Sequence, residues 1–264
     1  MSKPKVAILL PTMGGVTEET MISLVSVVAY SMSKGIQVDV INESVTGVAL
    51  CRNSLVKTVL NYDFTHVFFI DSDMFFPMTV LEDLLGCGVD IVGVPYVGRK
   101  LPAGLLGAPL HVADRDKTSG VVEAETMPSG MILIKTDVFR AIPAPWYFES
   151  YAYKGSRQQQ FRECVQDALG DPLPLGVMVE LMFSPKLKAW LESPEHGKHG
   201  LTYDCSEDSN FVFKARRHGF CAWSNLDIAP HVGHVGKYVF GMKDLDFGKK
   251  LDSRGDKQEQ GRAP

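Results

Sequence analysis

The sequence predicts an α/β protein, a single domain built on a Rossmann-like mixed sheet flanked by helices. Strand and helix patterns alternate up to Lys100, which is the order that such a sheet requires. The strand segments are short apolar runs, which is typical of strands covered on both faces. With 264 residues and 45% hydrophobic composition, the chain is large enough to bury one sizeable core.

Each element of the first half is predicted from its own local pattern. Apolar residues at helical spacing (Met21, Leu24, Val25 and Val28) indicate a helix over residues 18–33, followed by a stop signal at Lys34-Gly35. A second helix, over 77–85, has a proline near its first turn, and a third covers 50–60. Strands are predicted at 5–10, 36–41, 66–70 and 90–95. These βα units form a predicted nucleotide-binding half over residues 1–100.

The second half is less regular. Gly and Pro interrupt short apolar segments at 101–112 and 119–139, which predicts hairpin-like pieces. The segment from about 146 to 200 has poor periodicity and several prolines, and we expect an insertion or lid over the site. We therefore expect one domain over 1–248, with an acceptor half at 101–248. The charged, Gly/Gln-rich residues 249–264 are expected to form a disordered tail.

Charge and composition exclude some classes of function. A net charge of −4 and a pI near 6.0 argue against broad adhesion to nucleic acid or anionic membranes. Basic pairs such as Arg99-Lys100 are either phosphate contacts or solvated surface. No apolar run reaches the roughly 18 residues needed to span a bilayer or resembles a signal peptide, so we expect a cytoplasmic protein. The five cysteines are odd in number without Cys-x-x-Cys spacing, which predicts free, mostly buried thiols.

The most informative motif is the apolar run at 67–70, which ends in Asp71-Ser72-Asp73. Ligands of open α/β sheets bind at the carboxyl ends of strands, so both carboxylates stand where a ligand is expected. Paired carboxylates at the edge of a core need a cation, and their hard oxygens suit Mg²⁺ or Mn²⁺. The alternative is that Asp71 caps the following helix and Asp73 is solvated.

Several motifs, taken in order, resemble GT-A-fold glycosyltransferases, particularly the small family-two-like enzymes of phages and bacteria. Besides Asp-x-Asp, they are the first strand with Pro11-Thr12, the Ala-Arg-Asn-like helix start at Arg52-Asn53, the turn at Ser129-Gly130, the pair Glu207-Asp208, and the late histidines His231 and His234. The resemblance covers most of the chain. It implies a GT-A version of the predicted α/β sheet.

The resemblance also implies a metal-dependent transfer of a sugar from a nucleotide-sugar, expected to be a UDP-sugar, to a hydroxyl acceptor. Asp73 is the implied direct ligand of Mn²⁺ or Mg²⁺, and Asp71 binds the ribose or reaches the ion through water. His234, flanked by Gly233 and Gly236, fits the family's metal histidine better than His231, although either can be an ordinary loop or core residue. The implied substrate-binding residues are Pro11, Thr12, Arg52, Asn53, Asp71, Ser72, Ser129 and Gly130.

Inverting transfer needs an ionised base within reach of the acceptor hydroxyl. The resemblance assigns this role to Asp208 and an orienting or structural role to Glu207. Alternatively, Ser206 caps a helix over 207–218 and both acids favour its positive end. Both roles are compatible, but a helix N-terminus lowers a carboxylate's pKa and so weakens it as a base. The assignment of Asp208 therefore depends on the resemblance.

Arg52 is a further candidate, because the helix macrodipole disfavours a cation at a helix start. Its expected partner is the nucleotide or, alternatively, Glu43 or Asp71 through a salt bridge.

Other function classes remain open. A GT-A-fold nucleotidyltransferase is disfavoured because residues 11–17 contain no basic side chain, and a non-catalytic nucleotide-sugar-binding protein is disfavoured because both acidic motifs are intact. The acceptor is left open between a glycan, a protein and a hydroxymethylated DNA base.

Overall fold

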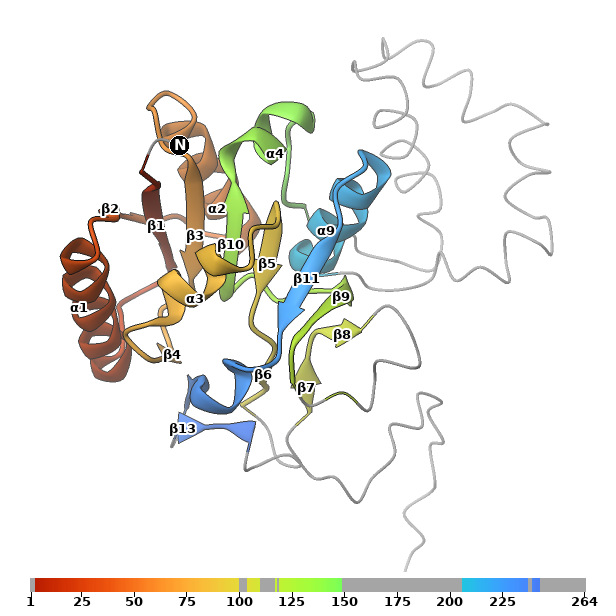
Figure 1. The fold of residues 1–264 in the computed structure, drawn as a ribbon. Helices are drawn as coiled ribbons and strands as arrows, with labels where there is room; N and C mark the ends of the chain where they lie inside the picture. The colour runs from red at the N-terminus through yellow and green to blue at the C-terminus, as the bar shows by residue number, and fades with distance from the viewer. Residues whose placement is uncertain are drawn as a thin grey trace, which may run out of the picture.

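The computed structural model describes residues 3–99, 104–109, 117, 119–148, 206–236 and 239–242 (Figure 1). Most of the predicted insertion and the whole tail at 249–264 lie outside the described residues. The helices are α1 (Glu18–Ser33), α2 (Val48–Val59), α3 (Val80–Gly86), α4 (Thr136–Ala141), α9 (Glu207–Arg217) and the 3-10 helix η2 (Ala229–His231). The strands are β1 (Lys5–Thr12), β2 (Gln37–Ser44), β3 (His66–Ile70), β4 (Met74–Phe75), β5 (Ile91–Gly93), β6 (Tyr96–Val97), β7 (Leu105–Leu106), β8 (Ala108–Pro109), β9 (Val121–Thr126), β10 (Met131–Lys135), β11 (Ala222–Asn225), β12 (Gly233–Val235) and β13 (Val239–Phe240).

One mixed sheet organises the described residues, with eight strands in the order β2-β1-β3-β10-β5-β11-β9-β8. β1 pairs in parallel with β2 and β3, and β5 pairs in parallel with β11. β10 lies between β3 and β5 and is antiparallel to both, so these two strands run in the same direction. The carboxyl ends of β1, β3 and β5 therefore meet at one edge of the sheet, which is where ligands bind in such folds.

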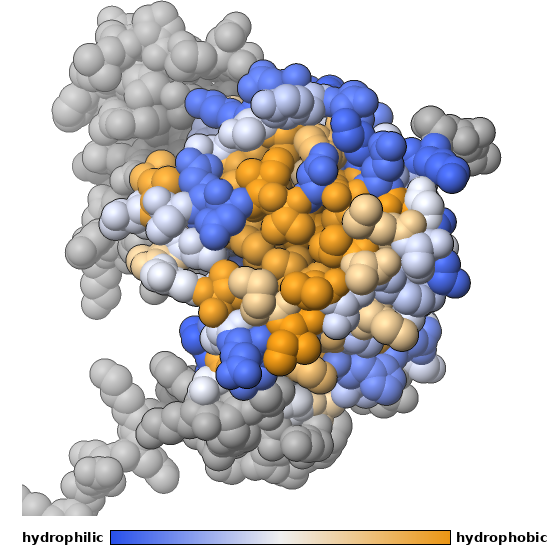
Figure 2. All heavy atoms as spheres, turned by 90° about the vertical axis from the view of Figure 1, so that its left-hand side faces the viewer, coloured by the Kyte–Doolittle hydropathy of each residue, from blue (hydrophilic) through white to orange (hydrophobic). Residues whose placement is uncertain are grey.

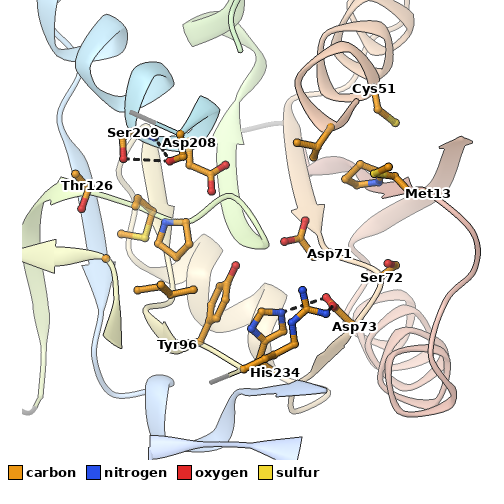
Figure 3. A pocket seen from close by; sticks show the side chains of 18 of the residues that line it. Met13, Cys51, Asp71, Ser72, Asp73, Tyr96, Thr126, Asp208, Ser209 and His234 are labelled. Atoms are coloured by element: carbon orange, nitrogen blue, oxygen red, sulfur yellow. Dashed lines mark hydrogen bonds and ion pairs between the residues drawn. The ribbon is translucent and has the colours of Figure 1, made fainter. Parts of the chain in front are cut away.

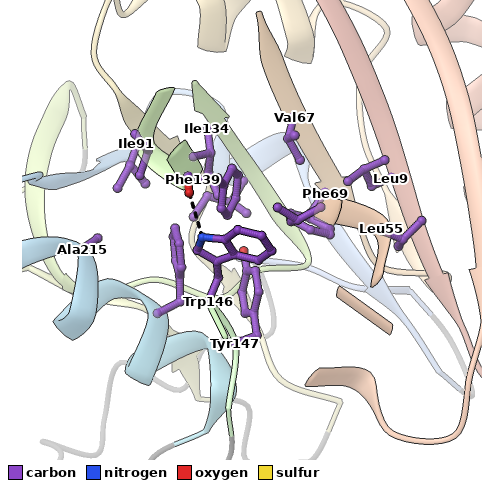
Figure 4. Packing of buried hydrophobic residues seen from close by; sticks show 14 of the residues in the cluster. Leu9, Leu55, Val67, Phe69, Ile91, Ile134, Phe139, Trp146, Tyr147 and Ala215 are labelled. Atoms are coloured by element: carbon purple, nitrogen blue, oxygen red, sulfur yellow. Dashed lines mark hydrogen bonds between the residues drawn. The ribbon is translucent and has the colours of Figure 1, made fainter. Parts of the chain in front are cut away.

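Helices cover both faces of this sheet (Figure 1). On one face, α2, α4 and α9 pack on the inward side chains of β1, β3, β10 and β5. Figure 4 shows this core, in which Trp146 and Tyr147 fill the space between the sheet and the helices. The Trp146 indole Nε1 donates to the carbonyl of Phe139 at 2.9 Å, so its polar atom is satisfied within the core.

On the other face, α1 and α3 pack on the alternate residues of the same strands. In β3, for example, Val67 and Phe69 face the first core and Phe68 and Ile70 face the second. Strand residues alternate between faces, so burial on both sides requires a continuously apolar strand. The predicted fold class, a Rossmann-like mixed α/β sheet flanked by helices, is confirmed.

Three expectations need correction. The segment at 119–139 does not form a hairpin, because β9 pairs with β8 and β11 while β10 pairs with β3 and β5. Asp71 does not cap the next helix, whose N-cap is Thr79. Among the three cysteines that the structure describes, only Cys51 is buried, whereas Cys221 is exposed and Cys87 is intermediate. The prediction that the thiols are mostly buried is therefore wrong for these three.

Candidate functional site

A cavity of about 630 Å³ opens at the carboxyl edge of the sheet (Figure 3). The ends of β1 and β3 form one wall, and the start of α9 with the segment before β10 forms the wall across from it. The lining residues are Pro11, Thr12, Met13, Val48, Cys51, Asp71, Ser72, Asp73, Tyr96, Arg99, Leu105, Leu106, Gly107, Thr126, Met127, Pro128, Ser206, Asp208, Ser209 and His234. Most of the residues predicted from the sequence thus surround one space.

Asp71 is fixed at the cavity by the turn before β10. Its backbone N–H donates to the carbonyl of Gly130 at 3.0 Å. A Cβ at position 130 would lie 2.5 Å from Oδ2 of Asp71 and would also collide with the Tyr96 hydroxyl, so no side chain fits here. We expected this glycine to admit a ligand, but its open side is filled by Asp71 and Tyr96. Ser129 is fully buried and does not line the cavity.

Arg52 connects the two walls from beneath the cavity floor. It comes from α2 and is 1% exposed. Its Nη2 donates to Oδ1 of Asp71 at 2.7 Å, and its Nη1 donates to Oδ1 of Asp208 at 2.8 Å and to Glu207. Of the two alternatives to a nucleotide partner, the salt bridge with Asp71 is present, and the one with Glu43 is not among the ion pairs of the described residues. Arg52 does not line the cavity, so the ion cluster, rather than a nucleotide, compensates its charge in this structure.

The cluster perturbs the ionisation of its members. Burial alone would lower the pKa of Arg52, but Asp208, Asp71 and Glu207 raise it above its ordinary value, so the guanidinium remains charged. Burial raises the pKa of Asp71, and neighbouring Asp208 and Asp73 add to this effect against the opposing charge of Arg52. The pKa of Glu207 is raised by burial and by Asp208, again against Arg52.

Asp73, which also lines the cavity, has different partners. Its Oδ2 accepts from Nη1 of Arg99 at 2.5 Å, and its Oδ1 lies 3.4 Å from Nε2 of His234 (Figure 3). Burial raises the pKa of Asp73, but His234 and Arg99 outweigh burial and the net shift is downward. This carboxylate therefore stays ionised, as a metal ligand must.

His234 lies on β12 and is buried. Its Nδ1 is 3.3 Å from the carbonyl of Val97, and its ring packs edge to face on Tyr96 with 5.3 Å between centroids. If Nδ1 of the neutral ring donates to that carbonyl, Nε2 is an acceptor on the side of Asp73 and could share a cation with it, whereas the protonated ring pairs with Asp73 directly. Histidines that bind metals typically use their second nitrogen in this way. His231, in contrast, is exposed on η2 and lines a separate cavity with Phe75.

The side chains around the cavity differ from a complete binding site for Mn²⁺ or Mg²⁺. Within the described part of the chain, no group of three or more His, Cys, Asp and Glu side chains is arranged to hold a metal ion. Asp73 and His234 could together offer two ligands, and ions of this kind often bind one or two protein groups together with water and substrate phosphates. Four carboxylates (Asp71, Asp73, Glu207, Asp208) face the two guanidinium groups of Arg52 and Arg99, so the ionised site has two negative charges in excess.

The opposite wall presents the start of α9. The Ser206 hydroxyl accepts from the backbone N–H of Ser209 at 3.4 Å, so Ser206 is the predicted N-cap. Asp208 lines the cavity, whereas Glu207 does not and is turned toward Arg52. Of the two acids, Asp208 is the one with access to a ligand.

Asn53 was predicted to bind substrate, but its side chain makes structural hydrogen bonds instead. Its amide oxygen accepts from the backbone N–H groups of Trp146 and Tyr147, and its amide nitrogen donates to the carbonyls of Ala49 and Tyr147. It does not line the cavity. The predicted substrate contact is therefore replaced by an anchor for the segment at 146–147, because all four bonds of the amide are already used.

Tyr96 and Arg99 are among the lining residues that were not predicted as site residues, although Arg99 was considered as a phosphate contact. Both follow β5 closely, at the same edge of the sheet as Asp71. The rule that ligands gather at strand ends, applied to β5 as well as β3, would have found them.

Solved structures that are similar to this chain include two proteins of low sequence identity. No family model matches the chain, and no curated protein matches it. A197 from STIV is 19% identical, with a TM-score of 0.40 over 55% of this chain and 71% of that chain. A glycosyltransferase involved in the glycosylation of the major capsid of PBCV-1 is 10% identical, with a TM-score of 0.32 over 83% of this chain and 93% of that chain. In the described residues, no helix is both long and apolar enough to cross a membrane.

Proposed function

We propose that this protein is a metal-dependent glycosyltransferase that moves a sugar from a UDP-sugar to a hydroxyl acceptor with inversion at the anomeric carbon. One observation carries the proposal: a single cavity has Asp73 and His234 on one side and Asp208 on another, with Arg52 bonded to both Asp71 and Asp208. Leaving-group stabilisation and base catalysis need such separate groups around one space.

Asp73 and His234 would hold Mn²⁺ or Mg²⁺, which when bound supplies Lewis-acid neutralisation of the leaving diphosphate. The other steps belong to side chains of this chain. Thr12 and Pro11 border the nucleotide, and Asp71, held by Arg52, orients the ribose from the end of β3. A nucleoside diphosphate is anionic, so the excess negative charge of the site disfavours it in the absence of a cation.

Asp208 would accept the proton of the acceptor hydroxyl as its oxygen attacks the anomeric carbon and the bond to the diphosphate breaks. Arg52 donates directly to Oδ1 of Asp208 and so fixes the position of this carboxylate at the cavity wall. A single displacement assisted in this way inverts the anomeric centre.

The proposal is tested by measuring UDP release from a panel of UDP-sugars with and without Mn²⁺. The wild type should release UDP only with the metal, and UDP with Mn²⁺ should raise its melting temperature. Asp73→Ala should abolish both effects and leave the apo fold intact.

Asp90→Ala is the matched control, because this carboxylate pairs with Lys135 at the opposite edge of the sheet. It should retain turnover. Unchanged turnover in Asp73→Ala would remove the metal assignment, and absence of UDP release from every donor would remove the activity.

A further inference from the structure

The helix α1 buries several hydroxyl-bearing residues and exposes several large apolar ones, which is the reverse of the usual arrangement. Its buried residues are Thr20, Ser23, Leu24, Val27 and Ser31, of which three carry hydroxyl groups. Its exposed side carries Met21, Ile22, Val25 and Met32, and the last three are 59–61% exposed. A helix that needs only to cover a sheet normally turns its apolar stripe inward.

The hydroxyl groups fix the helix in this orientation. Thr20 donates through Oγ1 to the carbonyl of Met74 at 2.7 Å, and the Ser23 hydroxyl accepts from the backbone N–H of Phe76 at 3.3 Å. Rolling the helix to bury its outer stripe would break both buried bonds. The outward apolar face is therefore a fixed property of the folded chain.

The exposed stripe has the spacing of a helix-pairing seam. Ile22, Val25, Ala29 and Met32 are separated by three, four and three positions, as in the core positions of a heptad repeat. No charged residue occurs between Glu19 and Lys34. Ala29, near the middle of the stripe, leaves room for a second helix to approach closely.

Figure 2 views the molecule from the side of α1 and β2 and shows a broad hydrophobic area framed by hydrophilic residues. β2 is the edge strand of the main sheet, and its Val40 is an exposed apolar residue beside α1. A contiguous apolar area rimmed by polar residues is typical of a protein–protein interface.

We propose that this face is the interface of a homodimer, in which α1 packs antiparallel on α1 of a second copy. A two-fold arrangement centred near residue 27 sets Ile22 against the partner's Met32 and Val25 against the partner's Ala29. Such a contact is self-complementary, as two-fold symmetry requires. Val40 and its neighbours on β2 widen the contact beyond the helix pair.

The charges at the helix ends select this direction. Glu18 and Glu19 stand at the start of α1, and Lys34 follows its end. In the antiparallel pair each Lys34 faces position 20 of the partner, one position from the partner's Glu19 and two from its Glu18, which is about 1.5–3 Å along the axis. A parallel pair would place like charges together at both ends. The Lys34 side chain is half-exposed, and its 3.9 Å contact with Glu82 leaves it able to reach across the interface.

Sedimentation velocity at about 1–100 µM tests the inference, which does not depend on the proposed function. The full chain should be dimeric. Val25→Glu should raise the dissociation constant about a hundredfold or more, because two carboxylates would enter the seam. Tyr62→Glu, an equally exposed aromatic on another surface, should remain dimeric. Circular dichroism melting shows whether each variant is folded.

Charge reversal tests the direction. Lys34→Glu should weaken the dimer, and adding Glu18→Lys and Glu19→Lys to it should restore the dimer. A monomeric wild type, including one that binds a different protein through this face, would overturn the homodimer, as would a folded Val25→Glu that dimerises normally. If the variant that combines all three charge reversals does not recover the dimer, the antiparallel arrangement is overturned.

Discussion

The two acidic pairs at the cavity have similar composition but differ in how they share counterions. Asp71 and Asp73 follow a strand and pair with two different cations, Asp71 with the buried Arg52 and Asp73 with Arg99. Glu207 and Asp208 begin a helix and share Arg52. Arg52 is almost inaccessible, whereas the Arg99 side chain is half-exposed.

The difference in exposure between Arg52 and Arg99 indicates that Arg52 has a structural role, whereas Arg99 can exchange its partner. A buried ion pair is costly to break, because the remaining charge stays out of water, whereas an exposed pair contributes little. Arg52 therefore holds the walls together permanently. We expect the half-exposed Arg99 to leave Asp73 at a smaller cost than Arg52 would leave its partners. Of the two carboxylates after β3, Asp71 is therefore held in place by Arg52, and Asp73 is the one that a ligand can more easily reach.

The largest expected effect comes from removing Arg52. Arg52→Met leaves three neighbouring carboxylates without their shared cation and should lower the free energy of unfolding by about 3–5 kcal/mol. Denaturant unfolding measures this loss. Arg140→Met is the control, because Arg140 pairs with the exposed Asp137 at 3.2 Å and should matter by less than about 1 kcal/mol. Equal losses in the two variants would mean that the buried cluster does not hold the walls.

The second largest effect is a difference in turnover between variants of the two acids of α9, Asp208 and Glu207. Asp208→Asn should lower turnover by about 10²- to 10⁴-fold, the usual contribution of a general base, and leave the affinity for UDP and Mn²⁺ nearly unchanged. Glu207→Gln should do less, because this side chain faces Arg52 and not the cavity.

Loss of folding or of UDP binding as the main effect of Asp208→Asn would make the residue a structural acid. Product stereochemistry is an independent check: retention of the donor's configuration in the nuclear magnetic resonance spectrum contradicts a single displacement.

A smaller effect is expected at the late histidines. His234→Ala should weaken Mn²⁺ binding in the presence of UDP by about 10- to 100-fold, as loss of a group that ligates or orients a metal usually does. His231→Ala is the matched control, because its side chain lies outside the main cavity. Titration calorimetry gives both constants, and the reverse ranking would transfer the ligand role to His231.

The smallest effect is a difference in pH dependence between Asp71 and Asp73. The pKa of Asp73 is lowered on folding, so its stabilisation is present above about pH 3.9 and is lost as pH falls through the lower folded value. The pKa of Asp71 is raised, so stability is gained as pH falls from above that raised value toward about pH 3.9. Urea unfolding between pH 3 and 7 should show a shallower acid loss for Asp73→Asn and a steeper one for Asp71→Asn. Shifts of the same sign would contradict the contrast.

The strand-end carboxylates were predictable because their signal is local. An apolar run of the length of β3 identifies a doubly covered strand, and its last residue places Asp71 at the ligand edge. The same reasoning located Ser206 as an N-cap and the boundaries of α1. These features depend on a few neighbouring residues, which the sequence displays directly.

Features that depend on distant residues were not predictable in the same way. Helical spacing located α1 but not its buried face, since Met21 and Val25 proved exposed while Thr20 and Ser23 proved buried. The decisive bonds are made with residues 74–76, far along the chain. Sequence proximity likewise suggested a hairpin for β9 and β10, which are instead separated by β5 and β11.

During synthesis of the chain, Arg52 is made long before two of the carboxylates that neutralise it. Glu207 is 155 positions downstream of Arg52, so at typical synthesis rates of about 5–20 residues per second it emerges roughly 8–30 s later. Until then Arg52 has Asp71 as its partner but lacks both acids of α9. A ribosome that stops before Ser206 releases a chain whose sheet lacks β11 and whose buried arginine lacks two counterions. We expect quality control to recognise such a truncated chain, because its sheet is incomplete and its buried arginine lacks two of its three carboxylate partners.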